Sequence, residues 1–162
     1  AAKTMNFLTE HGISSYGELE SKLTAISARR DTAHAEIKRI ESRSAELALV
    51  MKHAGTYRQL KPLYDRYRKS NDKEKFLRGH ESEIILFEAA ARELKRLGAV
   101  PLPTTESMKT ELAKLNAEKE RLLAEYKAAR AEAQEYETVK QNVDALLAVP
   151  KEQEQQRRHE LE

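Results

Sequence analysis

Apolar residues recur along this chain at alternating intervals of three and four residues, in two long runs separated by a less regular stretch. Nine of the eleven positions in the first run are apolar: Leu19, Leu23, Ile26, Arg30, Ala33, Ile37, Ile40, Ser44, Leu47, Met51 and Ala54. Ten of the twelve positions in the second run are apolar: Met108, Leu112, Leu115, Lys119, Leu122, Tyr126, Ala129, Ala133, Tyr136, Lys140, Val143 and Leu147. Such narrow stripes are typical of coiled-coil helices.

Turn and capping residues divide the chain into five predicted segments. They are a short N-terminal helix (1–12), a first coiled-coil arm (13–54), a helical head (55–104), a second coiled-coil arm (105–149) and a polar tail (150–162). Gly12 is a typical helix C-cap, and Ser15 with Glu18 has the spacing of a capping box. Ala54, Gly55 and Thr56 predict a break or bend after the first arm. The tail has no apolar period, so we expect a frayed helix or disorder there.

Within the head, the pattern predicts two shorter helices. Thr56 and Gln59 have capping-box spacing for the first, in which Pro62 either occupies an early turn or kinks a continuing helix. The run 70–72 predicts a turn and N-cap before a second helix that ends at Gly98. Two prolines exclude a helix over residues 99–104, after which Thr104 or Thr105 caps the second arm.

The fold class we predict is all-α: a long antiparallel coiled-coil hairpin with a small helical head between the two arms. The two stripes span 36 and 40 residues, so they can zip together within one chain. The register we expect pairs Ala54 with Leu112, Ile40 with Tyr126 and Leu19 with Leu147. The short N-terminal helix would then close the open end against Val143 and Leu147, and three alanines (33, 129 and 133) would form a narrow waist. A parallel homodimer is the alternative, because either stripe can pair with its own copy.

Composition supports long helices and narrows the choice of chemistry. The 162 residues are 35% charged, with only 5 Gly, 4 Pro and no Cys or Trp, which argues against a sandwich, a barrel or a Rossmann fold. The lack of cysteine excludes disulfides, thiolate zinc ligands and a thiol nucleophile, and fits a cytoplasmic protein. We expect no membrane segment and no signal peptide. Because the chain starts at Ala1 and ends in Leu161-Glu162, we expect a fragment with a cloning scar.

No residue pattern predicts catalysis. The five histidines are at least 19 residues apart, so none has the i, i+4 spacing of a helical metal site. The glycines are isolated and form no phosphate-binding loop, and no serine stands in a nucleophile elbow. We therefore expect no enzyme activity, no metal ion and no cofactor.

Residues 57–80 form the one region that stands out by charge, with eight basic side chains against three acidic ones. Tyrosines alternate with these basic residues, as a surface that tracks phosphates and stacks on bases requires. The candidate contact residues for DNA or a partner protein are Arg58, Lys61, Tyr64, Arg66, Tyr67, Arg68, Lys69, Lys73, Lys75 and Arg78. Nucleic-acid contact, protein contact and simple solvation with the tyrosines packed inside all remain open.

Two blocks in the head carry a resemblance to a known family. Thr56-Tyr57-Arg58-Gln59-Leu60-Lys61-Pro62-Leu63-Tyr64 resembles the C-terminal region of relaxases, the mobilization nucleases of Gram-positive conjugative and mobilizable elements. Lys73-Glu74-Lys75-Phe76 and the block from His80 to Ala90 are similar to the same region. The flanking Ser-Tyr-x-Glu-Leu at residues 15–19 and Asn142-Val143-Asp144 also look like that family.

The resemblance implies an accessory, non-catalytic role in DNA transfer. In such proteins an N-terminal domain nicks DNA with a catalytic tyrosine and a metal-bound histidine cluster, which we expect upstream of Ala1. The region behind the nuclease would contact relaxosome or coupling proteins during plasmid or transposon mobilization, dimerise the relaxase, or hold DNA near the nick. The alternatives are a DNA-binding arm that uses residues 57–80 and a purely structural coiled-coil spacer.

Overall fold

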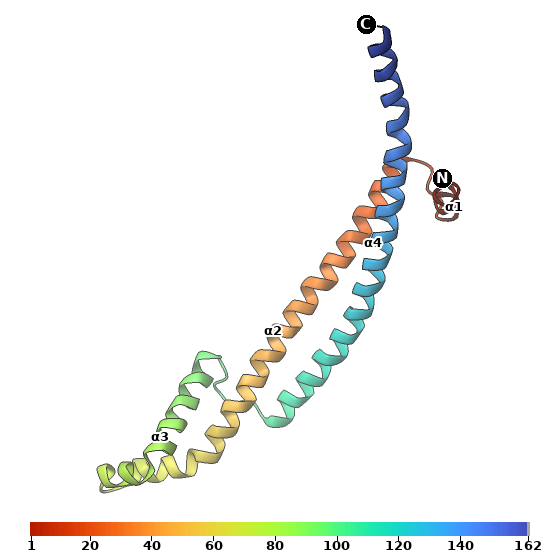
Figure 1. Ribbon diagram of the computed structural model, residues 1–162. Helices are drawn as coiled ribbons and strands as arrows, with labels where there is room; N and C mark the ends of the chain where they lie inside the picture. Colours follow the sequence, from red (N-terminus) through yellow and green to blue (C-terminus); the bar gives the residue numbers. More distant parts are fainter. Residues whose placement is uncertain (162) are drawn as a thin grey trace. The chain divides into compact units, whose positions relative to one another are not determined.

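The computed structural model describes residues 1–148, 158, 160 and 161, and these residues form helices and turns without a strand (Figure 1). The helices are α1 (Ala2–Glu10), α2 (Tyr16–Lys69), α3 (Lys73–Arg96) and α4 (Thr105–Leu161). The predicted all-α class is therefore confirmed for the described residues. Most of the polar tail predicted for 150–162 lies outside them.

The helix ends agree with the capping signals in the sequence. Gly12 and Gly98, which come just after α1 and α3, have positive φ angles of 64° and 69°. These left-handed conformations cost glycine little and let the chain leave a helix sharply. The hydroxyl of Ser15 accepts a hydrogen bond from the Glu18 backbone N–H at 3.1 Å, as the capping box predicts, although the Glu18 carboxylate reaches Ser14 instead of Ser15.

The connections around α3 agree with the predicted turns. The Asp72 carboxylate accepts a hydrogen bond from the Lys75 backbone N–H at 3.1 Å, and Thr104 caps α4 through the Ser107 N–H at 3.1 Å. The chain is not helical between α3 and α4, where two prolines were expected to prevent it. His80 has φ −137° and ψ 27°, so α3 contains a kink that the pattern did not predict.

The sequence predicted a break or a bend at Ala54, Gly55 and Thr56, and a break there is wrong, because α2 continues to Lys69. Gly55 keeps a negative φ, and the Thr56 hydroxyl donates to the Lys52 carbonyl within the helix instead of capping a new one. Pro62 also lies inside α2, where it removes one backbone donor. The helix bends along the stretch drawn in yellow, which includes this proline (Figure 1).

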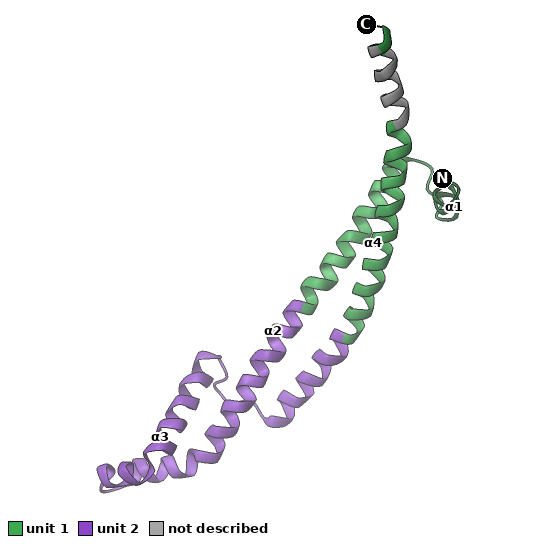
Figure 2. Cartoon of the chain, viewed as in Figure 1, with its two compact units in different colours: residues 1–37, 120–162 green, residues 38–119 purple. Residues whose placement is uncertain are grey.

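The chain forms two compact units, residues 1–37 with 120–162 and residues 38–119 (Figure 2). The first unit has its core where α1 packs on α2 and α4. Its buried side chains are Phe7, Ile13, Leu19, Ile26, Ala133, Tyr136 and Val139. The edge of the Phe7 ring meets the Tyr136 ring at a centroid distance of 5.0 Å, and Thr4 is hydrogen-bonded to Asn142 at 3.3 Å. The short first helix was predicted to close the open end against Val143 and Leu147; Val143 does pack on this core, whereas Leu147 is 58% exposed.

Three contacts fix how α2 and α4 meet in this first unit. The hydroxyl of Tyr16 bonds to Asp144 at 2.6 Å, Arg29 pairs with Glu132 at 3.0 Å, and the His34 and Tyr126 rings lie 5.6 Å apart. Residue numbers thus rise along α2 as they fall along α4. The three alanines of the predicted waist are all buried.

The predicted register is wrong by about one heptad, because Tyr126 lies against His34 and not against Ile40. Leu147, expected opposite Leu19, is 58% exposed, whereas Val143 packs on the core of the first unit. A heptad stripe repeats every seven residues, so a slip of that size keeps apolar residues at the seam. Apolar positions alone therefore leave this choice open.

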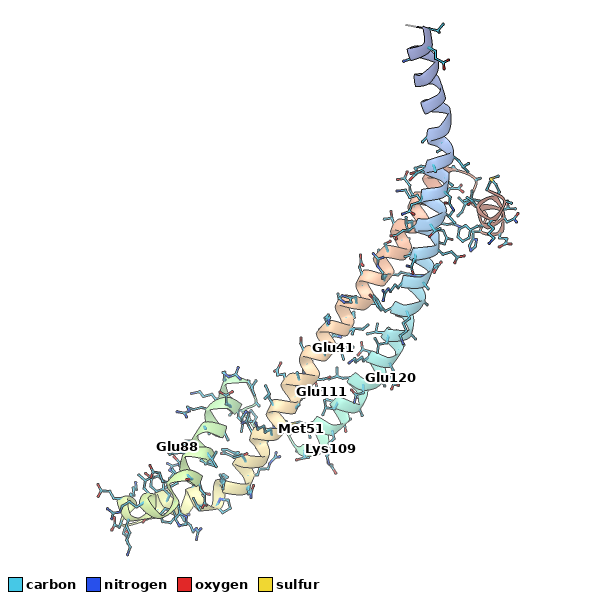
Figure 3. The ribbon with its side chains drawn as sticks, in the orientation of Figure 1. Glu41, Met51, Glu88, Lys109, Glu111 and Glu120 are labelled. Atoms are coloured by element: carbon cyan, nitrogen blue, oxygen red, sulfur yellow. The ribbon has the colours of Figure 1, made fainter. Side chains whose placement is uncertain are left out.

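In the second unit, ion pairs join α2 to α4 and apolar side chains join α2 to α3. Arg43 holds Glu111 through two hydrogen bonds of 2.8 and 3.2 Å, and Lys119 lies 3.7 Å from Glu41 (Figure 3). The buried apolar side chains of this unit include Leu47, Val50, Ala54, Leu63, Ile84, Phe87, Ala90 and Leu94. The head thus consists of α3 folded against the last part of α2.

Candidate interaction surface

The sequence-predicted contact residues lie on the last turns of α2 and the first turns of α3. A turn over residues 70–72 joins the two helices, with the Ser70 N–H bonded to the Tyr67 carbonyl at 3.2 Å. The rings of Tyr67 and Phe76 lie 6.0 Å apart across this turn. The fold therefore brings basic residues from both sides of the turn to one end of a helical pair.

The aromatic residues of this region are half-buried and contact one another. The rings of Tyr57 and Tyr64 are both stacked on Phe87, at centroid distances of 4.8 and 4.2 Å. Phe76 lies between Tyr67 and His80. The sequence left open whether these tyrosines face outward or pack in the head, and the structure packs them against rings of α3 while leaving part of each side chain accessible.

Two of the candidate basic residues make contacts within the protein. The Arg58 guanidinium donates to the Pro103 carbonyl at 2.7 Å and to the Thr105 hydroxyl at 3.1 Å. Lys61 pairs with Asp65 at 3.2 Å. Arg58 thereby ties α2 to the start of α4, so its replacement would disturb the fold as well as any surface.

The other six basic candidates are exposed, and none forms an ion pair with a carboxylate in the part of the chain that the structure describes. We call these six residues the cationic tip: Arg66, Arg68, Lys69, Lys73, Lys75 and Arg78. Elsewhere basic residues meet carboxylates, as in Arg43–Glu111 and Arg96–Glu93. The tip is thus a concentration of positive charge that the surrounding described residues leave unneutralised.

An open groove runs along one side of the α2–α3 pair. Its lining residues are Tyr57, Lys61, Tyr64, Asp65, Arg68, Phe87, Glu88, Ala91 and Arg92. Both signs of charge occur along it, and its aromatic rings are stacked on one another.

Two features of α3 were not predicted. Ile85 and Leu86 are 54% and 55% exposed, although they lie in a continuous apolar run with buried neighbours at Ile84 and Phe87. A helix turns by about 100° per residue, so a run of four apolar residues cannot face one side, and this was the available signal. Nδ1 of His80 is buried without a hydrogen-bond partner among the described residues, and lies 3.8 Å from Glu83.

Two stretches that are far apart in the sequence, residues 15–19 and 142–144, contact each other in the first unit. The hydroxyl of Tyr16, from residues 15–19, donates a hydrogen bond to the carboxylate of Asp144, from residues 142–144. This hydrogen bond raises the pKa of Tyr16 to about 12. In the same unit Asn142 bonds to Thr4. These residues fasten α1 and the start of α2 to α4, so their role in the structure is to hold helices together.

The described part of the chain has neither a cluster of metal-ligating side chains nor a helix suited to cross a membrane. No group of three or more His, Asp or Glu side chains stands together as metal ligands would. None of the helices in this part combines the length and apolar character that crossing a membrane requires.

The sequence matches no protein-family model, no curated protein and no solved structure.

Proposed function

We propose that this chain is a non-catalytic accessory module of a DNA-transfer relaxase, and that it mediates protein–protein contacts within the relaxosome in the cytoplasm. The relaxase part of the proposal comes from the resemblance of the head. The protein-contact part comes from α3, which carries the block from His80 to Ala90.

The observation that supports a protein contact is the exposure of Ile85 and Leu86. The residues on either side, Ile84 and Phe87, are already buried. Consequently the outward pair is not needed to hold α3 in place, and it leaves apolar area in water. Each such side chain would gain on the order of 1–2 kcal/mol by moving from half-exposed to buried in an interface.

We further propose that α2 and α4 form one antiparallel coiled-coil hairpin within a single chain, which carries the head at its closed end. The contacts inside each unit support this, since residue numbers rise along α2 and fall along α4 in both. A homodimer in which each stripe pairs with its own copy is the competing arrangement.

The test is direct binding to purified coupling protein and purified relaxosome proteins from the same element. The double variant Ile85→Ser/Leu86→Ser should weaken binding at least tenfold, because it replaces both exposed apolar side chains and leaves the inward side of α3 intact. Leu49→Ser on α2 is the matched control, since Leu49 is also an exposed apolar residue on a helix surface. It should bind like the wild type.

Equal binding by the double variant and the wild type would show that α3 does not make the contact. The absence of binding to every relaxosome protein would favour the simple spacer. Circular dichroism and thermal unfolding of each variant check that the helices persist.

A further inference from the structure

We propose that the cationic tip binds the phosphate backbone of duplex DNA without reading its sequence. This surface is separate from Ile85 and Leu86, so the inference goes beyond protein contact. The choice of DNA over another duplex nucleic acid rests on the proposed function, whereas the unneutralised charge of the tip is independent of it.

The distribution of charge is the first reason for this assignment. Residues 66–78 contain six basic side chains and only two acidic ones, Asp72 and Glu74. Asp72 is already engaged as the N-cap of α3. All six cations are exposed, and none has an ion-pair partner in the described part of the chain. They keep their full charge for an external anion.

Helix stability does not explain the three cations on α3, which is the second reason. Arg66, Arg68 and Lys69 lie at the C-terminal end of α2, where the helix dipole favours cations. Lys73 and Lys75, however, lie in the first turn of α3, where the dipole disfavours them. Lys75 and Arg78 are also three residues apart, so like charges face each other on one side of the helix. A bound polyanion would offset both the unfavourable interaction of the two lysines with the helix dipole and the repulsion between Lys75 and Arg78.

The packing of the aromatic rings selects the duplex over a single strand. Single-strand binding surfaces combine positive charge with exposed aromatic rings on which bases stack. Here the rings of Tyr64 and Tyr67 are half-buried, and their faces lie against neighbouring rings. Because ring faces that contact each other offer less area to a base, charge is the main attraction left, and charge favours the higher charge density of the duplex.

The test measures binding of the full chain to a labelled mixed-sequence DNA duplex by fluorescence anisotropy at several salt concentrations. Two triple variants remove one side of the tip each: Arg66→Gln/Arg68→Gln/Lys69→Gln and Lys73→Gln/Lys75→Gln/Arg78→Gln. The matched control, Lys109→Gln/Lys114→Gln/Lys127→Gln, removes the same net charge from exposed positions of α4 that have no ion pair with a described residue.

Each tip variant should weaken duplex binding at least tenfold in low salt and reduce the slope of log K against log salt by about two to three, since each phosphate contact contributes about 0.9. The control should stay within about twofold of the wild type, as expected for charges outside the contact surface. A scrambled duplex should bind as well as the first.

Several results would overturn the proposal. They are no duplex binding by the wild type in low salt, equal loss in the control and the tip variants, and equal binding of a single strand of the same length. Equal binding of polyglutamate would identify an acidic polypeptide as the partner class. The wild-type comparisons decide the question even if a tip variant fails to fold. The tip variants should lose DNA binding and keep relaxosome binding, whereas Ile85→Ser/Leu86→Ser should do the reverse. These two results separate this inference from the proposed function.

Discussion

Charged side chains at the edges of the apolar stripes form ion pairs between α2 and α4. Arg43 on α2 is the clearest case, because its guanidinium holds both carboxylate oxygens of Glu111 on α4. This contact lowers the pKa of Glu111 from its ordinary value of 4.5. The two side chains are about 40% exposed, so water screens the pair and its contribution to stability is small, about 0.5 kcal/mol.

Glu111→Gln should therefore lower the free energy of unfolding by about 0.5 kcal/mol at neutral pH and make no difference in strong acid. The folded carboxyl stays charged below pH 4.5, where the unfolded one takes up a proton. The pair thus adds stability above this pH and loses it as the pH falls through the lowered pKa. Urea unfolding at a series of pH values measures the difference. Glu120→Gln, which removes an exposed carboxylate of α4 that forms no ion pair with a described residue, is the control variant (Figure 3).

A glycine does not by itself end a helix in this protein, and α2 is long because it continues through Gly55. Gly55 and Gly98 are the same residue type with opposite roles. Gly55 lies within α2 and has a negative φ, whereas Gly98 comes after α3 with φ 69°. At both positions a Cβ would meet nothing within 4 Å, so only the backbone conformation distinguishes them.

Replacing these two glycines with alanine should change stability in opposite directions. Gly55→Ala should raise the free energy of unfolding by about 0.5–1 kcal/mol, because alanine is the better helix former. Gly98→Ala should lower it by about 1–2 kcal/mol, because the left-handed conformation crowds a Cβ. Chemical denaturation of both variants measures the effects. A destabilised Gly55→Ala variant would mean that α2 is interrupted there, contrary to the structure.

For the molecule as a whole, the main question is which helix each long stripe pairs with. In the first unit α2 and α4 of the same chain are joined by Arg29–Glu132 and Tyr16–Asp144. In the second unit they are joined by Arg43–Glu111. A parallel homodimer would instead place each of these residues beside the same residue of another copy.

Cross-linking distinguishes these two arrangements. Because the chain has no cysteine, only the introduced cysteines can react. Arg29→Cys/Glu132→Cys treated with a short bis-maleimide should give a product with the mass of a single chain, because the two side chains are 3.0 Å apart in the wild type. Mass spectrometry and denaturing electrophoresis identify the product.

The control pair is Arg29→Cys/Gln141→Cys, in which the second site lies nine residues further along α4. At about 1.5 Å per residue this moves it roughly 13 Å along the helix, so intramolecular cross-linking should fall sharply. A dominant product of twice the chain mass for the first pair would support the dimer and contradict the hairpin.

The sequence predicted the helix ends more accurately than the helix interiors. Asp72, Thr104 and the two positive-φ glycines are local signals, because each acts on backbone groups within a few residues. Gly55 and Pro62 carry the same kind of local signal, yet α2 passes through both. Leu63, just beyond the proline, is buried against the head, and such packing outweighs a local cost of a few kcal/mol.

The candidate surface could be predicted only in part. Its basic residues were evident from the sequence, because lysine and arginine side chains are usually exposed wherever they occur. The inward packing of Tyr57 and Tyr64 on Phe87 was not, because Phe87 lies more than twenty residues away in sequence. The exposure of Ile85 and Leu86 could have been predicted, because four consecutive apolar residues cannot all face one side of a helix.

By itself the sequence determined that this protein is helical, where its capped helix ends lie, and which side chains form the two apolar stripes, but it did not determine that α2 runs unbroken to Lys69. These properties result from backbone capping and from an apolar period of 3.5 residues. Both depend only on residues that are close together in the sequence. Only the tertiary structure decided the register of α2 on α4 and which basic residues stay unpaired. A heptad stripe fits its partner equally well after a slip of seven residues, so contacts such as His34–Tyr126 and Arg29–Glu132, between residues far apart in the chain, had to make the choice.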